Sequence, residues 1–140
     1  RGRNEVDTWR GAIRGTADSE AVHRNSIRAK ALDALRVSSG SDGVELAVHT
    51  FGPDPPGPHV LHAHATGFHG LVWQPLATRL TGHSCWAPDL RGHGDSDWAP
   101  DGDYTLDGFA ADIAEIAHVL PSPPALIGAS LGGISSLTAI

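Results

Sequence analysis

The sequence predicts an α/β domain in which a mostly parallel sheet is covered by helices on both faces. Short apolar runs at residues 44–52, 59–65, 84–90 and 125–130 are bounded by glycine, proline or polar turns, as strands are. Segments with helical spacing separate the last three runs. Strands that alternate with helices pair in parallel and bury both faces of their sheet.

Composition narrows the class of protein. With 140 residues, 40% of them hydrophobic, the chain is long enough for one domain with a buried core. Its net charge of −6 argues against a nucleic-acid-binding surface. The uncharged stretch 119–140 is interrupted by prolines and glycines, so we expect no membrane span. No signal peptide is recognisable, and we expect a cytoplasmic protein.

Charge divides the chain into two parts. Residues 1–36 carry eight of the ten basic residues, whereas residues 37–140 carry only Arg79 and Arg91 against eleven acidic residues. We therefore predict a polar N-terminal extension at 1–36 and a folded domain at 37–140, and we expect residues 1 to about 30 to be dispensable to the sheet. One candidate helix in the extension, Ser19–Arg36, has only a narrow apolar stripe.

The first half of the domain reads as strands around one helix. The strand at 44–52 is entered through the turn signal Ser-Asp-Gly, and residues 36–40 can pair with it as a hairpin. The proline-rich segment 54–58 is predicted as a loop. The spacing of Trp73, Leu76, Ala77 and Leu80 predicts a helix over 72–82.

The second half contains the clearest helix. Apolar residues keep helical spacing from Leu106 to Leu120, and Thr105 can cap the start. The sequence PSPP ends this helix, and a buried strand and another helix follow. The single cysteine, Cys85, excludes an intrachain disulfide and lies in an apolar strand, so we expect a buried core residue rather than a reactive thiol.

A serine sits in the turn between that last strand and helix. The pattern Gly128-x-Ser130-x-Gly132 is typical of a sharp strand-to-helix turn that lifts the serine above the sheet edge in strained backbone geometry. The following helix N-terminus offers unpaired N–H groups that stabilise an oxyanion. A tight glycine-rich connection with Ser130 as a helix cap explains the same pattern.

Three ordered motifs resemble those of the α/β-hydrolase superfamily. They are HATG at 64–67, DLRGHGDS at 89–96 and GASLGG at 128–133, and the resemblance covers residues 37–140. It implies an incomplete α/β-hydrolase fold with Ser130 as nucleophile. It further implies an oxyanion hole made by the backbone N–H groups of Leu131 and Thr66. Its remaining site-shaping residues are His64, Gly67, Asp89, Arg91, Gly128 and Gly132.

The chain departs from the family's pattern in two places. Ala65 stands where the family usually has glycine, and Thr66-Gly67 where many members have a bulky residue and proline, which weakens the Thr66 assignment. For Asp89 and Arg91, a structural ion pair or turn anchor is favoured over a role in the chemistry.

The activating groups of a catalytic serine are missing from their usual places. In this family an acid and then a histidine follow the serine, but the ten residues after Ser130 contain neither. His64 and His93 lie in loops near the predicted site, yet a structural role is favoured over that of a substitute base. The sequence therefore predicts no appreciable esterase turnover for this chain alone.

A metal site is the alternative interpretation of the histidines around the predicted oxyanion loop. His62 and His64 share one face of a strand, with His59 and His69 nearby, but the acidic partner of a metal motif is absent. The oxyanion-loop interpretation explains the same residues better, so we expect neither a metal nor a cofactor.

The resulting hypothesis is a fragment of a serine hydrolase. It would act on a small carboxylic ester or similar acyl bond through an acyl-serine intermediate. A catalytically inactive truncated product or an interaction module is the alternative. Lactone hydrolysis, carbon–carbon bond hydrolysis and cofactor-free haloperoxidation on the same fold also stay open. An exposed edge on the strand at 125–130 is expected to promote self-association.

Overall fold

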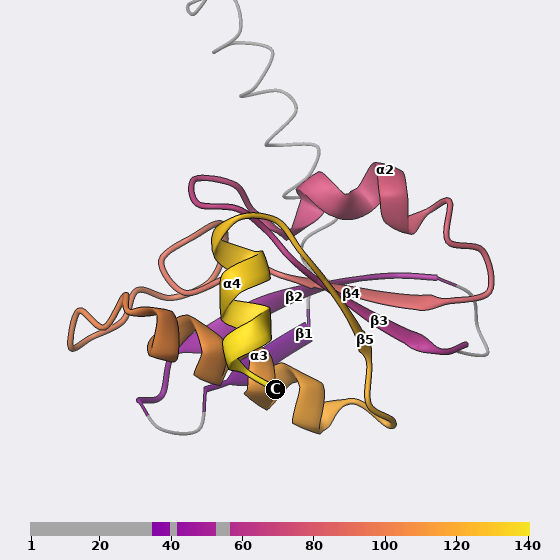
Figure 1. Cartoon of the computed structure of the whole chain (residues 1–140). Coiled ribbons are helices and arrows are strands. Elements are labelled where there is room, and N and C mark those ends of the chain that lie inside the picture. The colour runs from indigo at the N-terminus through magenta and orange to yellow at the C-terminus, as the bar shows by residue number, and fades with distance from the viewer. Residues whose placement is uncertain (1–34, 40–41, 53–56) are drawn as a thin grey trace, which may run out of the picture. The chain divides into compact units, whose positions relative to one another are not determined.

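The computed structural model describes residues 35–39, 42–52 and 57–140 (Figure 1). Its elements, in chain order, are β1 (Leu35–Ser38), β2 (Glu45–Phe51), β3 (His59–Ala63), η1 (Gly70–Trp73), α2 (Gln74–Ala77), β4 (Ser84–Pro88), α3 (Leu106–Val119), β5 (Ala125–Gly128) and α4 (Leu131–Thr138). The candidate helix Ser19–Arg36 lies outside the described residues up to residue 34, as does most of the predicted loop 54–58. Leu35 and Arg36 belong to a strand and not to that helix.

The sheet has five strands in the order β1-β2-β4-β3-β5. β2 pairs antiparallel with both β1 and β4, whereas β3 pairs parallel with β4 and β5. Four strands therefore run in one direction and only β2 runs against them, which confirms the mostly parallel sheet. The predicted hairpin is also present, with Val37 opposite Leu46. Among the described residues β5 pairs only with β3, and it forms one edge of the sheet.

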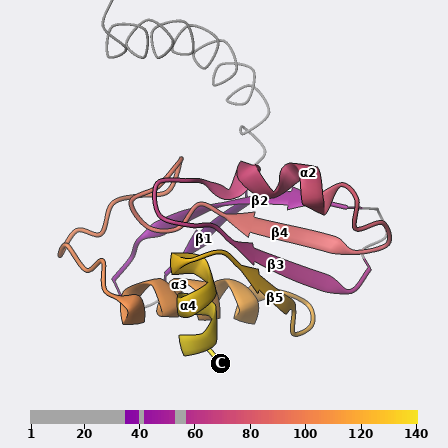
Figure 2. The same cartoon turned by 45° about the horizontal axis from the view of Figure 1, so that its top comes forward.

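Helices cover both faces of this sheet (Figure 2). On one face Leu46, Leu61 and Val48 pack in a cluster with Phe109, Ile113 and Ile116 of α3. On the other face Val60 and Cys85 pack with Ala77 of α2. The alternation of Val60 and Leu61 between the two clusters follows from the two-residue period of a strand. Cys85 is buried, as predicted, and burial raises the pKa of its thiol.

The start of α3 is fixed as the sequence predicts. Thr105 is extended, and its hydroxyl accepts a hydrogen bond from the Gly108 N–H at 3.2 Å. This bond satisfies one of the free N–H groups at the helix start. The predicted apolar face is mostly buried, but Leu106 at its beginning is 45% exposed.

The predicted helix over 72–82 was wrong in its length. The structure has a short 3-10 helix, η1, followed by one turn of α-helix, α2. Pro75 explains the break, because it has no N–H to continue the hydrogen-bond ladder of η1 and suits the first turn of a new helix. Of the expected face only Ala77 is buried, and Leu76 is 40% exposed.

Candidate active site

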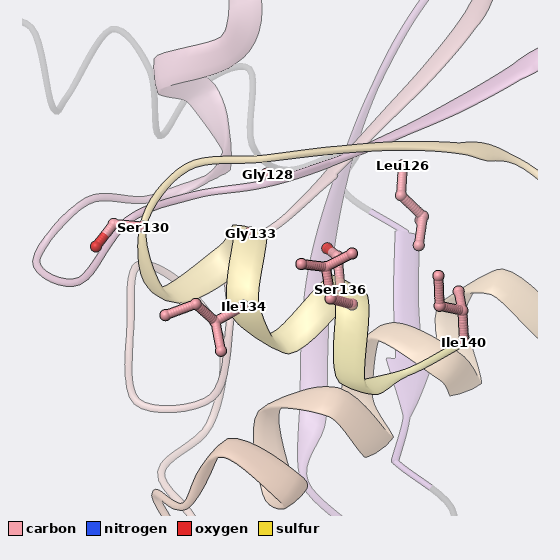
Figure 3. A pocket seen from close by; sticks show the side chains of 8 residues that line it. Leu126, Gly128, Ser130, Gly133, Ile134, Ser136 and Ile140 are labelled. Atoms are coloured by element: carbon pink, nitrogen blue, oxygen red, sulfur yellow. The ribbon is translucent and has the colours of Figure 1, made fainter.

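Ser130 occupies the turn between β5 and α4 in a strained conformation. Its φ of 48° and ψ of −114° make it the only residue other than glycine with positive φ in the described part of the chain. Its side chain is exposed and makes no capping hydrogen bond to α4. Figure 3 shows the hydroxyl at the outside of the turn, away from Leu126 and Ile140. Such strain clusters at functional sites, and the hydroxyl is free to react.

The glycines around Ser130 have no room for a side chain. A Cβ on Gly128 would lie 2.5 Å from the Gly133 backbone, and one on Gly132 would lie 2.6 Å from the His64 carbonyl oxygen. The Gly132 N–H also donates to the His64 oxygen at 3.1 Å, and the Ala129 N–H donates to the Ala63 oxygen at 3.0 Å. The turn is therefore held against the end of β3.

The start of α4 presents the Leu131 N–H beside the serine, without an acceptor among the described residues, whereas the next N–H, that of Gly132, is bonded to His64. Leu131 is its first residue, and the first N–H groups of a helix have no intrahelical acceptor. The first turn contains no acidic residue that would neutralise the positive end of the helix dipole. This end of α4 is thus suited to a negative charge next to Ser130.

Thr66 lies in the loop that follows β3. The Phe68 N–H donates to the Ala65 oxygen at 3.1 Å and closes a turn around Thr66 and Gly67. Gly67 has a φ of 79°, and nothing lies within 4 Å of its missing Cβ, so its glycine serves the backbone conformation rather than close packing. Thr66 is exposed. Because β3 and β5 are parallel neighbours, this loop and Ser130 both follow the carboxyl ends of their strands, on the same side of the sheet.

His64 has both ring nitrogens engaged. Its Nε2 accepts the Leu90 N–H at 3.0 Å, so its Nδ1 carries the proton and donates to the Ala65 oxygen at 2.8 Å. Burial lowers the pKa of this fully buried ring and outweighs the hydrogen bond to Ala65, which raises it. His64 is therefore a neutral structural link between two loops and has no free nitrogen to act as a base.

His93 lies against His64 but makes no bond to Ser130. The Nδ1–H of His93 donates to the Arg91 oxygen at 2.9 Å, and the ring meets that of His64 edge-on, with centroids 5.0 Å apart. In the described part of the chain no histidine is hydrogen-bonded to the Ser130 hydroxyl.

Asp89 is a buried hydrogen-bond acceptor. Its Oδ1 accepts the Gly70 N–H at 2.6 Å and the His49 Nε2–H at 3.1 Å, and its Oδ2 accepts the Asp95 N–H at 2.8 Å. Burial raises the pKa of Asp89, but the bonds from His49 and the two backbone N–H groups outweigh it, so the net shift is downward. The carboxylate stays ionised and holds two loops together.

Arg91 has its own partners and does not pair with Asp89. Its guanidinium is fully buried and donates a bidentate pair of hydrogen bonds to the Asp112 carboxylate of α3, with both N–O distances 2.7 Å. It also donates to the Asp103 carbonyl at 3.0 Å and lies 2.9 Å from an Asp42 carboxylate oxygen. These carboxylates raise the pKa of Arg91 further. Arg91 thus ties the loop after β4 to α3.

The histidines considered for a metal site have separate surroundings. The ring of His62 packs at a tilt against that of Trp73, with centroids 5.3 Å apart, while His64 contacts His93. No group of three or more His, Cys, Asp or Glu side chains converges in the described ranges. Both ring nitrogens of the buried His62 and the Trp73 indole nitrogen have no hydrogen-bond partner there.

An apolar groove of about 470 Å³ lies between β5 and α4 (Figure 3). Ser130 and Leu126 line it, together with Ile134, Leu137 and Ile140. Those last three side chains are 53%, 74% and 89% exposed. The groove therefore leaves a sizeable apolar surface uncovered by the described residues.

Comparison with known proteins places these features in a family context. The model of the alpha/beta hydrolase family matches residues 60–140. Lipase LipV of Mycobacterium tuberculosis is 36% identical over 94 residues, which are 64% of this chain and 34% of the lipase. The pimeloyl-(acyl-carrier protein) methyl ester esterase of Aeromonas salmonicida is 36% identical over 92 residues, 65% of this chain and 34% of that esterase. The chain thus spans about a third of these relatives.

A solved structure agrees with the sequence matches. The esterase EaEST from Exiguobacterium antarcticum superposes with a TM-score of 0.67 at 28% identity, over 76% of this chain and 39% of the esterase. In the ranges that the structure describes, every helix is too short or too polar to cross a membrane.

Proposed function

Because the chain belongs to the alpha/beta hydrolase family, we propose that it supplies the nucleophile-bearing part of a serine hydrolase that cleaves carboxylic esters or similar acyl bonds. The observation that carries this proposal is the strained, exposed Ser130 at the N-terminus of α4, with a hydroxyl that caps nothing. A structural turn gains nothing from such a residue, whereas a nucleophile must be exposed.

The proposed reaction has two steps. The Ser130 Oγ attacks the ester carbonyl carbon, and a base removes its proton while the carbonyl oxygen becomes an oxyanion. The N–H groups of Leu131 and Thr66 hold that oxyanion. The C–O bond of the ester then breaks, the alcohol leaves with the proton, and water hydrolyses the acyl-serine to an acid and free Ser130.

The base and its supporting acid are assigned to a part of the hydrolase outside this sequence. The engaged nitrogens of His64 support this assignment, as does the lack of a histidine bonded to Ser130 in the described ranges. The relatives support the substrate class, a small ester-like molecule, because one is a lipase and another a methyl ester esterase. A cytoplasmic location, which fits a chain without a disulfide, belongs to the same proposal.

A catalytically inactive product or interaction module is the second candidate. The same lack of a base at Ser130 favours it, because a serine hydroxyl is a weak nucleophile without one. The uncovered groove beside Ser130 offers such a module its contact surface. We include in the proposal that two copies of the chain associate through this groove.

An activated ester separates the two candidates. Because the base is assigned elsewhere, imidazole is added as an external base. We then expect purified chain incubated with 4-nitrophenyl acetate to accumulate one acetyl group on the peptide containing Ser130, seen by mass spectrometry. The Ser130→Ala variant should show no such adduct. Absence of the adduct in the wild type would support the inactive module. Repeated turnover without imidazole that disappears in Ser130→Ala would place a base within this chain and overturn its assignment elsewhere.

A further inference from the structure

Two consecutive residues, Asp89 and Leu90, hold the two ends of the loop that carries Thr66. At its beginning His64 accepts the Leu90 N–H, and at its end Gly70 donates its N–H to Asp89. Between these ends residues 66–69 are exposed, and the described bonds are local ones: the turn at Ala65–Phe68, the His64 ring on the Ala65 oxygen and the Val72 N–H on the His69 oxygen. The position of the Thr66 N–H therefore depends on how firmly the two ends are held.

The Gly70 end is closely packed. A Cβ on Gly70 would collide with the Ala87 carbonyl oxygen and lie 2.8 Å from Cδ2 of the His49 ring. His49 is opposite Ala87 in the β2–β4 pairing, so its side chain lies beside Ala87, on the face where η1 begins. The ring is only 6% exposed.

His49 and Gly70 bind the same oxygen. An aspartate carboxylate can only accept, so the His49 Nε2 carries a proton and donates it to Asp89 Oδ1 at 3.1 Å. That oxygen also accepts the Gly70 N–H at 2.6 Å, and the other oxygen is held by Asp95. His49 thus fixes the rotation of the carboxylate that in turn fixes Gly70.

We propose that His49 is a positioning residue for the Thr66 loop, acting through Asp89 Oδ1 on the Gly70 N–H. Its value for catalysis rests on the proposed function, in which Thr66 holds the oxyanion, but its action on the loop does not. Without His49 the carboxylate loses one of its three anchors and can rotate away from Gly70. The loop end is then free to shift, and a small shift misplaces an oxyanion donor.

A matched pair of variants tests the proposal. The amide nitrogen of glutamine reaches about as far as the histidine Nε2, whereas that of asparagine is one methylene shorter. We expect His49→Asn to speed amide hydrogen exchange at Gly70 at least tenfold, and His49→Gln to restore it to within about threefold of the wild type. The Leu90 amide, bonded to His64, is the internal reference and should exchange at its wild-type rate.

Two results would overturn the proposal. One is unchanged exchange at Gly70 in both variants. The other is an equal rise at Gly70, Leu90 and the α3 amides, which marks a general loss of stability rather than a displaced loop. Should His49→Asn not fold, His49→Leu carries the same test, because it removes the donor without burying an unpaired amide.

A second measurement tests whether the position of the loop affects acylation of Ser130. With imidazole as the external base, acetylation of Ser130 by 4-nitrophenyl acetate should slow in His49→Asn and recover in His49→Gln, in parallel with Gly70 exchange. If the wild-type chain shows no acetylation, the ester-cleaving function fails, whereas the exchange comparison still decides the role of His49.

Discussion

The loop after β4 holds the loop that follows β3, whereas β5 and α4 carry Ser130, and these two regions are built in opposite ways. In the loop after β4, Asp89 and Arg91 are buried, and each is held by several hydrogen bonds to other described residues. At the edge formed by β5 and α4 no residue from 119 to 140 is charged, and apolar side chains of α4 face solvent. The buried charged groups of the loop therefore have their hydrogen-bond partners within the described residues. The apolar surface beside Ser130, in contrast, is exposed.

The largest expected effect on stability comes from removing the positive charge of Arg91 in the loop after β4. Arg91→Met leaves Asp112 buried without its partner, and we expect the free energy of unfolding to fall by about 3–5 kcal/mol. Arg79→Met, at an arginine whose described side-chain contact is an exposed bond to Pro75, should change it by less than about 0.5 kcal/mol. Urea unfolding measures both, and a loss under about 1 kcal/mol for Arg91→Met would contradict the role of Arg91 in tying this loop to α3.

The open edge is tested by self-association. The groove is uncharged, while residues 37–118 carry eleven acidic residues against two arginines, so two copies can approach here without charge repulsion. We expect sedimentation equilibrium to show dimers of the wild-type chain, and Leu137→Glu to weaken them at least tenfold.

Leu106→Glu is the control, because it adds the same charge at an exposed leucine in the first turn of α3, where an acid is favourable. Equal weakening by both variants, or a monomeric wild type, would rule out association through the groove. If Leu137→Glu does not fold, Ile140→Glu lies beyond α4 and tests the same surface.

His62 contrasts with Asp89 and Arg91, because it is a buried polar side chain with no hydrogen-bond partner among the described residues. Burial lowers its pKa from the ordinary value of 6.5, so the folded state disfavours its proton. Stability from this group is therefore present above pH 6.5 and lost as pH falls below it. His64 shifts in the same direction.

We expect His62→Leu to raise the free energy of unfolding at pH 7.5 by about 1–2 kcal/mol, because it removes unpaired nitrogens from the interior. It should also reduce, but not abolish, the loss of stability between pH 7.5 and 5.5, since His64 remains. Urea unfolding at the two pH values gives both numbers. A variant that is less stable at pH 7.5 would mean that His62 has a partner, such as a buried water.

The turn at Ser130 was predictable from sequence because its causes are local. The spacing Gly128-x-Ser130-x-Gly132 alone predicts a turn in which side chains at the glycines would strike the backbone, and the structure has those close contacts. The helix at 106–119 was predictable for the same reason, since its periodicity and its Thr105 cap are both read within a few residues.

The support of the site was not predictable, because its partners are far apart in sequence. His49 lies in an ordinary strand pattern and meets Asp89 40 residues later, and Arg91 meets Asp112 21 residues later. Only the pairing of β2 with β4 brings the first pair together. The length of the helix predicted at 72–82 was wrong although a local signal against it was present. Pro75 indicates a break in the helix, but the apolar spacing favours a continuous one.

The central claim, that the turn at Ser130 stabilises a negative charge, can be measured without a base. In Ser130→Cys the thiol sits at the N-terminus of α4, and its pKa follows from the pH dependence of iodoacetamide alkylation. Thr50→Cys, at an exposed position of strand β2, is the reference with an ordinary pKa of about 8.5. The account predicts a thiol pKa below about 7.5 at position 130, and a value equal to or above that of the reference would contradict it.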